Sequence, residues 1–466
     1  MKLSQLTVCK DALADLEIKG ITDDSRKVKN GFAFVNTQNS NTYVADAIKN
    51  GASVVITSDD CDFKNTVRVE DTRKAYAQIS SNWFNKPSND LILIGVTGTN
   101  GKTSVTYMLK SILESVGEKV GVIGTVGYYI DGETTPSINT TPNPYYLNEL
   151  FQKMREKGCK YVIMEISSHA LDREYLYGLN FRVAMFTNLT QDHLDYHGNM
   201  ENYYLAKRKL FEICDCAVIN RDDKYSNRLL DEVKCKKTTY SIDNNSDYIA
   251  KAIKYMPTNV RYQLLTDTIN SIKVNTGGKF TVYNSLCAIA CALELGVSIN
   301  DISLALSSLK GVKGRAEVVP NTRDFTVIID YAHTPDGLKN VLKTFKECNK
   351  NRLIVLFGCG VDRDKTKRSL MGEIASIYAD YIIVTSDNPR TENPSLIIKD
   401  ILKGIPNSQF SCKVIENREK AIKFALSIAK KDDIIVLAGK GHENYQIIGK
   451  EKFPFDEREI VSQALK

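Results

Sequence analysis

Histidines, carboxylates and a lysine gather in one segment, "DHLDYHGNMENYYLAK", at residues 192–207. The chain has five histidines, and His193 and His197 are two of them. Mg²⁺ prefers oxygen ligands, so the closing lysine, Lys207, is a poor partner for it as a plain amine. A lysine held neutral can instead take up CO₂ and become a carbamate with two ligand oxygens. From spacing alone, a solvated helix face that includes Lys207 is the simpler interpretation.

A glycine-rich turn joins a buried strand to an amphipathic helix in "LILIGVTGTNGKTSVTYMLKSIL". It is similar to a phosphate-binding P-loop, except that Val96 stands where the strict pattern has glycine. Backbone N–H groups of such a turn cradle phosphate oxygens, a lysine reaches the terminal phosphates, and a hydroxyl can ligate Mg²⁺. The residues expected to bind ATP here are Gly98, Thr99, Asn100, Gly101, Lys102 and Thr103.

A second polar strand end follows in "KYVIMEISSHAL", which places Glu165 directly after apolar residues. A carboxylate at the end of a strand that neighbours a P-loop is well placed to bind Mg²⁺. We therefore expect Glu165 and Thr103 to share one metal site.

The composition predicts a soluble globular protein of two or three domains, because the chain has 466 residues of which 42% are hydrophobic. The net charge of +6 is weak and no basic run with interleaved aromatics occurs, which argues against nucleic-acid binding. No apolar run approaches the ~20 residues that span a bilayer, and no signal-peptide core is seen. We expect a cytoplasmic protein without membrane insertion, whose eleven scattered cysteines are reduced.

The pattern of apolar runs divides the chain into three zones. Residues 1–88 contain short runs such as "SVVITSD" and predict a small α/β domain. Residues 89–313 alternate buried strands with helices, which predicts a parallel sheet flanked by helices. Residues 314–466 repeat that alternation in "DFTVIIDYA", "RLIVLFGCG", "DYIIVTSDN" and "DDIIVLAGKG", as a Rossmann-like domain would. Ligands should lie beyond the carboxyl ends of these strands.

Between about residues 91 and 446, segments of the chain resemble the Mur ligase family in order and spacing: "GVTGTNGKT", "TTPNP", "MEISSHAL", "TNLTQDHLDYHGNMENYYLAKRKLF", "DYAHTPDGL", "CGVDRDKTKR", "SDNPRTENP" and "AGKGHENYQ". The resemblance implies a three-domain α/β fold and ATP-dependent amide formation through an acyl phosphate, with Mg²⁺ as cofactor. It is greatest for members that add meso-diaminopimelate to a UDP-N-acetylmuramoyl dipeptide, and we expect a monomer. The alternatives are a paralogue that uses a different carboxylate acceptor and a non-catalytic descendant.

The resemblance implies catalytic roles for Lys102, Lys207, His193 and Glu165. Thr103 and Glu165 correspond to ligands of one Mg²⁺, whereas His193 and a carbamylated Lys207 correspond to ligands of a second. Further ATP contacts are implied for Asn284, Arg315, Asp330 and His333. Asn284 could instead be a helix cap, and Arg315 could form a surface ion pair.

The amine substrate can be considered physically. The far end of meso-diaminopimelate is a zwitterion, so its pocket needs a forked donor for the carboxylate and an acid for the ammonium. Arg390 in "DNPR" and Glu443 in "GKGHEN" have these properties, although a surface turn with a solvated arginine is the alternative. The residues implied for this pocket are Arg363, Asp387, Asn388, Pro389, Arg390, Gly439 and Glu443.

The carboxylate acceptor should contact strand ends of the first two zones. The chain departs from the family there, since Arg173 and Tyr175 replace a usual Gln-x-Arg pair and the loop "TQNSNTYVADAI" lacks a usual D-G-H-like signature. The acceptor contacts that the resemblance implies are Ser25, Thr140, Thr141, Ser167, Arg173 and Tyr175.

Overall fold

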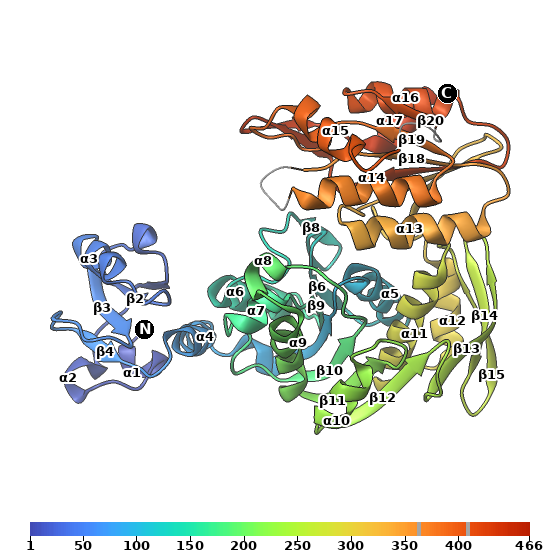
Figure 1. Cartoon of the computed structure of the whole chain (residues 1–466). Coiled ribbons are helices and arrows are strands. Elements are labelled where there is room, and N and C mark those ends of the chain that lie inside the picture. The colour runs from blue at the N-terminus through green and yellow to red at the C-terminus, as the bar shows by residue number, and fades with distance from the viewer. Residues whose placement is uncertain (361–364, 407–410) are drawn as a thin grey trace.

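The computed structural model of the protein describes residues 1–360, 365–406 and 411–466. The chain forms three α/β parts in succession, each with its own sheet. Figure 1 shows the N-terminal part set to one side, with the C-terminal part lying against the central one. The α/β class predicted from the alternating apolar runs is confirmed.

The N-terminal part is built on a four-stranded parallel sheet in the order β1-β2-β3-β4. Its elements are α1 (Leu3–Leu6), α2 (Asp11–Ala14), β1 (Gly20–Thr22), η1 (Ser25–Lys27), β2 (Phe32–Val35), α3 (Asn41–Lys49), β3 (Ala52–Thr57) and β4 (Thr66–Arg68). Its core includes Leu3, Val54 and Ile56, which are fully buried.

Helix α4 (Thr72–Trp83) and the short η2 (Pro87–Asp90) lead from the first sheet to the central part (Figure 1). The carboxylate of Asp71 accepts hydrogen bonds from the backbone N–H groups of Arg73 and Lys74. This cap satisfies donors that have no partner inside a helix, so it fixes where α4 begins.

The central part has an eleven-stranded sheet among the described residues, in the order β15-β14-β13-β12-β11-β10-β5-β9-β6-β7-β8. Its strands are β5 (Ile92–Thr97), β6 (Val120–Ile123), β7 (Tyr128–Ile130), β8 (Glu133–Thr135), β9 (Tyr161–Glu165), β10 (Phe181–Phe186), β11 (Cys214–Asn220), β12 (Lys236–Ser241), β13 (Tyr248–Tyr255), β14 (Val260–Leu265) and β15 (Ile269–Val274). The middle is parallel, whereas β14 and β15 at one edge and β7 and β8 at the other are antiparallel to their neighbours.

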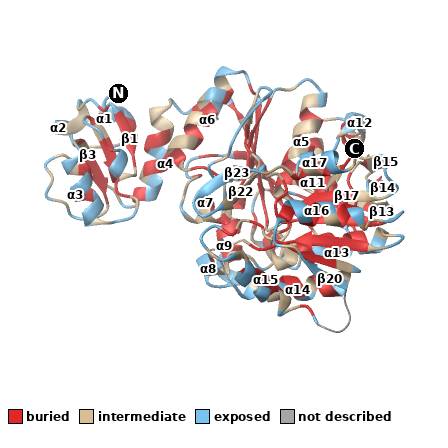
Figure 2. Ribbon diagram, turned by 90° about the horizontal axis from the view of Figure 1, so that it is seen from above, coloured by how far each residue is buried: buried red, intermediate tan, exposed pale blue. Residues whose placement is uncertain are grey.

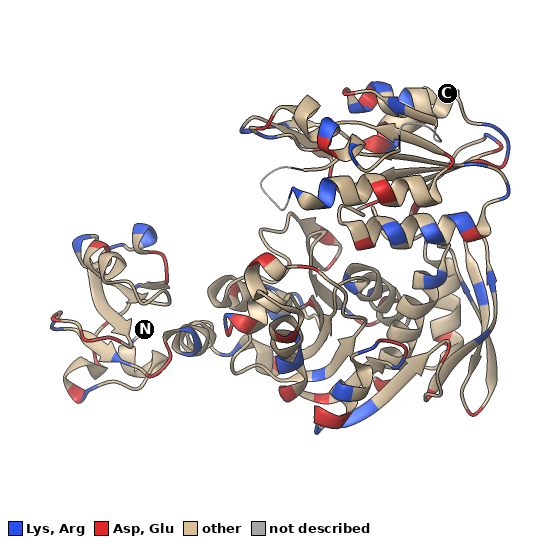
Figure 3. Ribbon diagram, in the orientation of Figure 1, with Lys and Arg blue, Asp and Glu red and all other residues tan. Residues whose placement is uncertain are grey.

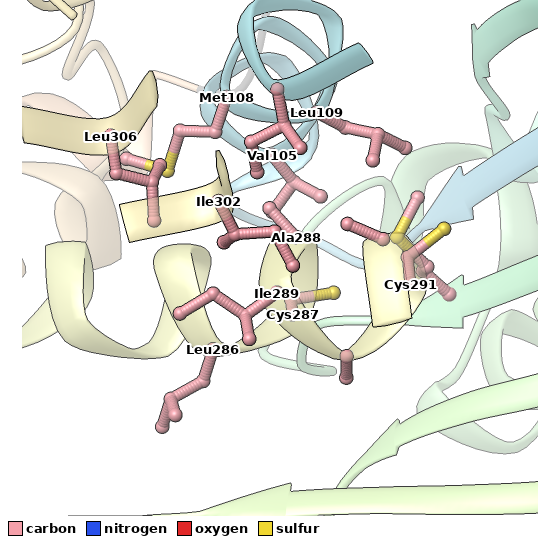
Figure 4. Packing of buried hydrophobic residues seen from close by; sticks show 14 of the residues in the cluster. Val105, Met108, Leu109, Leu286, Cys287, Ala288, Ile289, Cys291, Ile302 and Leu306 are labelled. Carbon is pink, nitrogen blue, oxygen red and sulfur yellow. The ribbon is translucent and has the colours of Figure 1, made fainter. Parts of the chain in front are cut away.

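Helices cover this sheet and hold the glycine-rich turn in place. They are α5 (Lys102–Ser115), α6 (Pro144–Glu156), α7 (Ser168–Asp172), α8 (Leu194–His197), α9 (Met200–Arg208), η3 (Lys209–Glu212), α10 (Ser226–Glu232), α11 (Lys279–Glu294) and α12 (Ile299–Ser308). Figure 4 shows apolar side chains of α5, α11 and α12 packed together, among them Val105, Ile289 and Leu306. This buried apolar packing fixes the position of α5, whose first turn carries the lysine and threonine of the P-loop.

The C-terminal part has a six-stranded sheet in the order β16-β17-β21-β18-β19-β20, parallel except for β16. Its strands are β16 (Glu317–Val319), β17 (Thr326–Asp330), β18 (Leu353–Phe357), β19 (Tyr381–Val384), β20 (Ser411–Val414), β21 (Ile434–Ala438) and the separate hairpin β22 (Tyr445–Ile448) with β23 (Glu451–Pro454). Its helices are α13 (Pro335–Cys348), α14 (Thr366–Tyr378), α15 (Pro394–Leu402), α16 (Arg418–Ser427) and α17 (Glu457–Ala464). All four strands predicted here are present.

Burial follows the sheets, as Figure 2 shows. In the C-terminal sheet, Ile328 and Val355 belong to the core on one face, whereas Ile329 and Ile354 belong to the core on the other. A strand that is buried on both faces reads as a continuous apolar run, which is why these strands could be predicted. Figure 3 shows Lys and Arg interspersed with Asp and Glu over all three parts.

Two further expectations concern the whole chain. The eleven cysteines are free thiols, as their scattered spacing predicts. Across the described ranges, none of the helices combines the length and the apolar character that crossing a membrane requires.

Candidate active site

The glycine-rich turn lies between β5 and α5 and requires glycine at two positions. Gly98 and Gly101 have φ of +144° and +89°, which other residues rarely adopt. A Cβ on Gly101 would collide with Oδ1 of Asn284, so Asn284 lies against the turn. Asn284 stands inside α11, and it is therefore not a helix cap. The Lys102 amine folds back and donates to the carbonyl oxygen of Gly98, at 2.9 Å.

Glu165 ends β9 beside the turn and is almost completely buried. Its Oε2 accepts hydrogen bonds from the hydroxyls of Thr103 (2.9 Å) and Thr125 (3.0 Å), and its Oε1 accepts one from the backbone N–H of Thr125 (3.0 Å). Parallel β5 and β9 are neighbours, which brings the two predicted Mg²⁺ ligands together. The structure thus places Thr103 against Glu165, as the P-loop interpretation predicts.

The donor set around Glu165 fits Mg²⁺ in its chemistry, since it consists of oxygens. Within residues 1–360, 365–406 and 411–466, no three His, Cys, Asp or Glu side chains form a metal-binding group. Mg²⁺ commonly binds through one or two carboxylates together with substrate phosphates. A site with one carboxylate and one hydroxyl beside a phosphate loop matches that pattern.

Lys207 lies inside the protein rather than on a solvated helix face, which was the simpler interpretation of its spacing. Its side chain is 3% exposed, and Nζ donates to the carbonyl oxygen of Gly98 at 2.9 Å. Nζ also lies 4.7 Å from the ring centre of Tyr203. Burial, with a further contribution from the Lys102 charge, holds the pKa of the Lys207 amine well below its usual range. Burial therefore favours the neutral form of the Lys207 amine.

His193 precedes α8 in the left-handed conformation, with φ of +53°. Its Nε2 lies 3.4 Å from Oδ2 of Asp192, and its ring is edge-on to His169 at 5.0 Å between centroids. Burial lowers the pKa of both His193 and His169, which favours neutral rings with a lone pair for a ligand. The Tyr203 ring is close to both predicted metal ligands, 6.2 Å from the ring of His193 and 4.7 Å from Nζ of Lys207. Spacing alone did not single out Tyr203.

His197 has a separate role from His193. Its Nε2 lies 2.8 Å from the hydroxyl of Ser168, and this contact joins α8 to the start of α7. It therefore holds α8 against the start of α7.

Arg315 reaches into the central part from the start of the C-terminal part. Its Nη2 donates to the hydroxyl of Thr103 at 3.1 Å, and its guanidinium lies 4.7 Å from the ring centre of Tyr331. The alternative of a surface ion pair is therefore wrong. Its buried Nε has no hydrogen-bond partner among the described residues, which leaves a charged donor for a ligand.

Asp330 and His333 follow β17. Both carboxylate oxygens of Asp330 accept backbone N–H groups, from Ala316 at 2.6 Å and Ala332 at 2.8 Å. Burial raises the pKa of Asp330, and the Arg315 charge opposes this. Nδ1 of His333 lies 2.8 Å from the carbonyl oxygen of Tyr331. Asp330 thus fixes the segment that carries Arg315.

A residue of α13 that was not predicted also joins the two parts. Oδ2 of Asp336 accepts hydrogen bonds from the Asn100 side chain (2.9 Å) and the Thr190 hydroxyl (2.8 Å). Figure 1 shows α13 on the side of the C-terminal part that faces the central part. The P-loop is consequently contacted by the C-terminal part through Asp336 as well as through Arg315.

Three of the predicted acceptor contacts lie next to Glu165. The Thr141 hydroxyl donates to the carbonyl oxygen of Glu165 (2.8 Å) and accepts the backbone N–H of Ser167 (2.9 Å). The Thr140 hydroxyl is 3.0 Å from that of Thr125. Ser167 caps α7, since its hydroxyl accepts the N–H of Ala170.

A cavity of about 480 Å³ lies between the N-terminal and central parts. Residues of both parts line it, including Asp23, Phe32, Tyr76, Asn139, Tyr145 and Tyr175. A hydrogen bond with Tyr175 raises the pKa of Arg173, so these two predicted contacts lie together. Ser25, also predicted, is the buried first residue of η1 and is not one of the lining residues.

The predicted amine pocket lies at the carboxyl ends of β19 and β21. The turn Asp387–Arg390 follows β19, and the Asn388 amide donates to Oε2 of Glu443 at 2.9 Å. A Cβ on Gly439, which follows β21, would approach Oδ2 of Asp387 to 2.7 Å. Arg390 has φ of +44°. Pro389 accepts the N–H of Glu392 within the same turn.

Arg363, the further predicted contact of this pocket, lies outside the described residues.

Comparisons with known proteins agree with this geometry. A family model described as the Mur ligase middle domain matches residues 96–292, and one described as the glutamate ligase domain of Mur ligases matches residues 314–441. A UDP-N-acetylmuramoyl-L-alanyl-D-glutamate--2,6-diaminopimelate ligase of Caldanaerobacter subterraneus subsp. tengcongensis is 48% identical over 97% of this chain and 95% of its own. A ligase of that name from Clostridium acetobutylicum is 46% identical over 98% and 96%.

A solved structure with the same ligase name also superimposes on the chain. It has a TM-score of 0.74 and 32% sequence identity, and the match covers 100% of this chain and 98% of that one. The similarity thus extends through the N-terminal part, beyond the motifs at residues 91–446.

A P-loop with its acidic neighbour, contacted by an arginine from a further α/β part, is the arrangement of an enzyme that binds nucleotide phosphates with Mg²⁺. The family models match more than half of the chain, and relatives match nearly all of it. The chain belongs to the Mur ligase family, and it uses ATP with Mg²⁺.

Proposed function

We propose that the protein joins meso-diaminopimelate to UDP-N-acetylmuramoyl-L-alanyl-D-glutamate, a step of peptidoglycan precursor synthesis. The observation that carries this proposal is the amine pocket, where the turn with Arg390 meets Glu443 through Asn388. An arginine and a glutamate suit an amine substrate whose far end has both a carboxylate and an ammonium. The far end of lysine has the ammonium but no carboxylate. Relatives at 48% and 46% identity carry the name of this ligase.

The reaction has two chemical steps. The acceptor carboxylate attacks the terminal phosphorus of ATP, which releases ADP and leaves an acyl phosphate. The amine then attacks the acyl carbon, and phosphate leaves from the tetrahedral intermediate while the amine loses a proton. The enzyme's main tasks are to position the reactants and to stabilise the charge that develops.

Residues of the P-loop perform the first task. Backbone N–H groups of residues 101–103 would bind phosphate oxygens, since those of Thr99 and Asn100 already donate to Asn188, and the Lys102 amine would leave the Gly98 carbonyl to reach the terminal phosphates. Arg315 brings a second positive charge from the C-terminal part, with its Nε still to be satisfied. Asn284, Asp330 and His333 complete the ATP site on the nucleoside side.

Thr103 and Glu165 would hold one Mg²⁺, and His193 with a modified Lys207 would hold a second. When bound there, Mg²⁺ supplies positive charge to the phosphate and carboxylate oxygens. Glu165 is already oriented by three hydrogen bonds, so its oxygens need little rearrangement.

We infer that Lys207 is carboxylated. The neutral amine attacks CO₂ and releases one proton, which leaves a carbamate with two oxygens. Burial favours the neutral, nucleophilic form of the Lys207 amine, and the nearby Lys102 charge would stabilise the carbamate anion once it has formed.

The acceptor would occupy the cavity between the first two parts. Tyr175 lines this cavity, Arg173 is beside it, and Thr140, Thr141 and Ser167 lead towards Glu165. Ser25 is buried and does not line the cavity, so it would support the acceptor site indirectly. The proposed division is a nucleotide-sugar-binding domain at 1–88, an ATP-binding domain at 89–313 and an amino-acid-binding domain at 314–466.

The amine pocket would combine the residues that the family resemblance implies: Arg363, Asp387, Asn388, Pro389, Arg390, Gly439 and Glu443. We propose that the protein works as a monomer in the cytoplasm, without nucleic-acid partners or membrane insertion. The interspersed surface charges are compatible with that (Figure 3).

The direct test is product analysis. The protein is incubated with ATP, Mg²⁺, UDP-N-acetylmuramoyl-L-alanyl-D-glutamate and meso-diaminopimelate, and the nucleotide-linked products are weighed by mass spectrometry. The expected product is the acceptor enlarged by one diaminopimelate minus water, with one ADP formed for each. Protein that binds ATP but yields no such product would contradict the proposal and indicate a different carboxylate acceptor.

A further inference from the structure

Lys440 is a fully buried lysine between the two turns of the amine pocket, and the mechanism does not use it. Its Nζ donates to the backbone carbonyl of Tyr445 (2.9 Å), to Oδ1 of Asn388 (3.0 Å) and to Oε2 of Glu443 (3.3 Å). Burying an ammonium is unfavourable unless it is paired and hydrogen-bonded. These three acceptors, from the turn at Asn388 and the segment 443–445, therefore fix both the lysine and the groups around it.

The charges around Lys440 do not cancel. Asp387 and Glu443 each bring a carboxylate, and Lys440 lies 3.3 Å from both. Oδ1 of Asp387 is buried and has no hydrogen-bond partner within the described residues, so its contact with Lys440 is an ion pair alone. Two carboxylates and one ammonium leave one negative charge, which a single ammonium group of a substrate would neutralise.

Lys440 also supports the strand that holds Arg390. The N–H of Arg390 donates to the carbonyl of Ile447 (3.1 Å), and the N–H of Gly449 donates to the carbonyl of Arg390 (2.8 Å). The N–H of Ile447 in turn donates to Oδ1 of Asn388 (2.9 Å), the oxygen that Lys440 also binds. A positive φ is unfavourable for arginine and persists where the surroundings impose it.

We propose that Lys440 is a positioning residue that selects an amine substrate with an ammonium and a carboxylate at its far end. It orients Glu443 and Asn388, leaves one negative charge beside Asp387 and Glu443 for the ammonium, and stabilises strand β22, which holds the backbone of Arg390. This role rests on the proposed function, and Lys440 itself does not touch the substrate.

The test compares Lys440→Met with Arg352→Met in the full-length protein. Methionine keeps much of the lysine's length without the charge. The Arg352 side chain pairs at 2.6 Å with the buried carboxylate of Asp433, which directly precedes β21. Lys440 follows the other end of that strand. Each variant thus removes one cation next to a buried carboxylate, at opposite ends of the same strand.

We expect Lys440→Met to raise KM for meso-diaminopimelate about 10- to 100-fold, the effect of losing a buried charged hydrogen bond, with KM for ATP nearly unchanged. Amide hydrogen exchange should become faster at residues 386–392 and 445–448. Arg352→Met should lower the melting temperature without either effect. Lys440→Arg, which keeps the charge but not the shape, should give a smaller rise in KM for the amine.

Equal rises in KM for the amine and for ATP in Lys440→Met would overturn the proposal, as would unchanged hydrogen exchange at 386–392. If Lys440→Met does not fold, a Lys440→Arg variant with wild-type KM for the amine would overturn it. Wild-type protein that forms no diaminopimelate product would instead contradict the proposed function. Hydrogen exchange still decides the positioning role in that case, since it needs no substrate.

Discussion

Lys102 and Lys207 donate to the same acceptor, the carbonyl oxygen of Gly98, at 2.9 Å each. Two ammonium groups on one oxygen repel each other, and burial disfavours both charges. Burial lowers the pKa of both amines, and the Lys102 charge adds to this effect at Lys207, whose pKa is held well below its usual range. Carboxylation of Lys207 would replace this repulsion by an attraction. It would thereby join the segment 192–207 to the P-loop electrostatically.

Replacing Lys207 tests the carbamate. Lys207→Ala should lower kcat at least about 1,000-fold, as expected when a group that orients transition-state charge is lost. A short carboxylic acid added to the assay should restore part of the rate, because it can supply the missing oxygens. Phosphate release from ATP measures both effects.

The control for this variant is Arg208→Ala on the same helix, since Arg208 forms ion pairs with Glu212 and Glu232 away from the P-loop. It should keep nearly full activity. Normal turnover by Lys207→Ala would contradict the carbamate, and so would intact wild-type protein whose mass never includes one added CO₂ under native conditions.

Arg315 should act on the transition state of phosphoryl transfer. Arg315→Ala removes a charge that reaches Thr103 and leaves the P-loop intact, so we expect kcat to fall about 100-fold or more. Arg323→Ala, an exposed arginine in the following loop, should have little effect. A fall in activity that the Arg323 control reproduces would argue against the assigned role.

Arg390 should determine use of the amine. Arg390→Ala should raise KM for meso-diaminopimelate about 100-fold through loss of a forked carboxylate contact, with KM for ATP nearly unchanged. Arg390→Lys, which keeps the charge but not the fork, should lie in between. Steady-state kinetics with each substrate varied in turn will show this, and equal losses for amine and ATP would refute it.

His442 should make stability depend on pH. Burial, followed by the nearby Arg315 charge, lowers its pKa to about 4 from the ordinary 6.5. The unfolded chain therefore binds a proton near pH 6 that the folded protein does not. This contribution to stability is present above about pH 6.5 and is lost as the pH falls towards about 4.

His442→Gln removes that proton linkage. Between pH 7 and pH 5 the free energy of unfolding of the wild type should fall by roughly 2 kcal/mol more than that of the variant. Urea unfolding at the two pH values measures the difference. Parallel losses in both proteins would mean that other groups account for the pH dependence.

Local patterns in the sequence were sufficient to predict the P-loop and most parallel strands. Gly98 to Thr103 lie within one turn, so their chemistry is readable from neighbours alone. Strands buried on both faces appear as apolar runs. The edges β7, β8 and β13 to β15 were not predicted, because a strand with one exposed face leaves a weaker pattern than such a run.

Contacts between distant segments could not be predicted in the same way. The burial of Lys207 depends on how α9 packs on the P-loop, which spacing within 192–207 does not reveal. Asp336 and Lys440 matter through partners in other turns or another part of the chain. The sequence around Asn284 does not reveal that α11 places its side chain against Gly101 of the P-loop.

We propose that this chain ligates an amine with a zwitterionic far end to the UDP-linked dipeptide. The most direct measurement is phosphate release from ATP with UDP-N-acetylmuramoyl-L-alanyl-D-glutamate present, with meso-diaminopimelate or L-lysine added in parallel. We predict rapid turnover with meso-diaminopimelate and at least about 100-fold less with L-lysine, which lacks the carboxylate for Arg390. Equal rates with both amines, or none with either from protein that binds ATP, would contradict the claim.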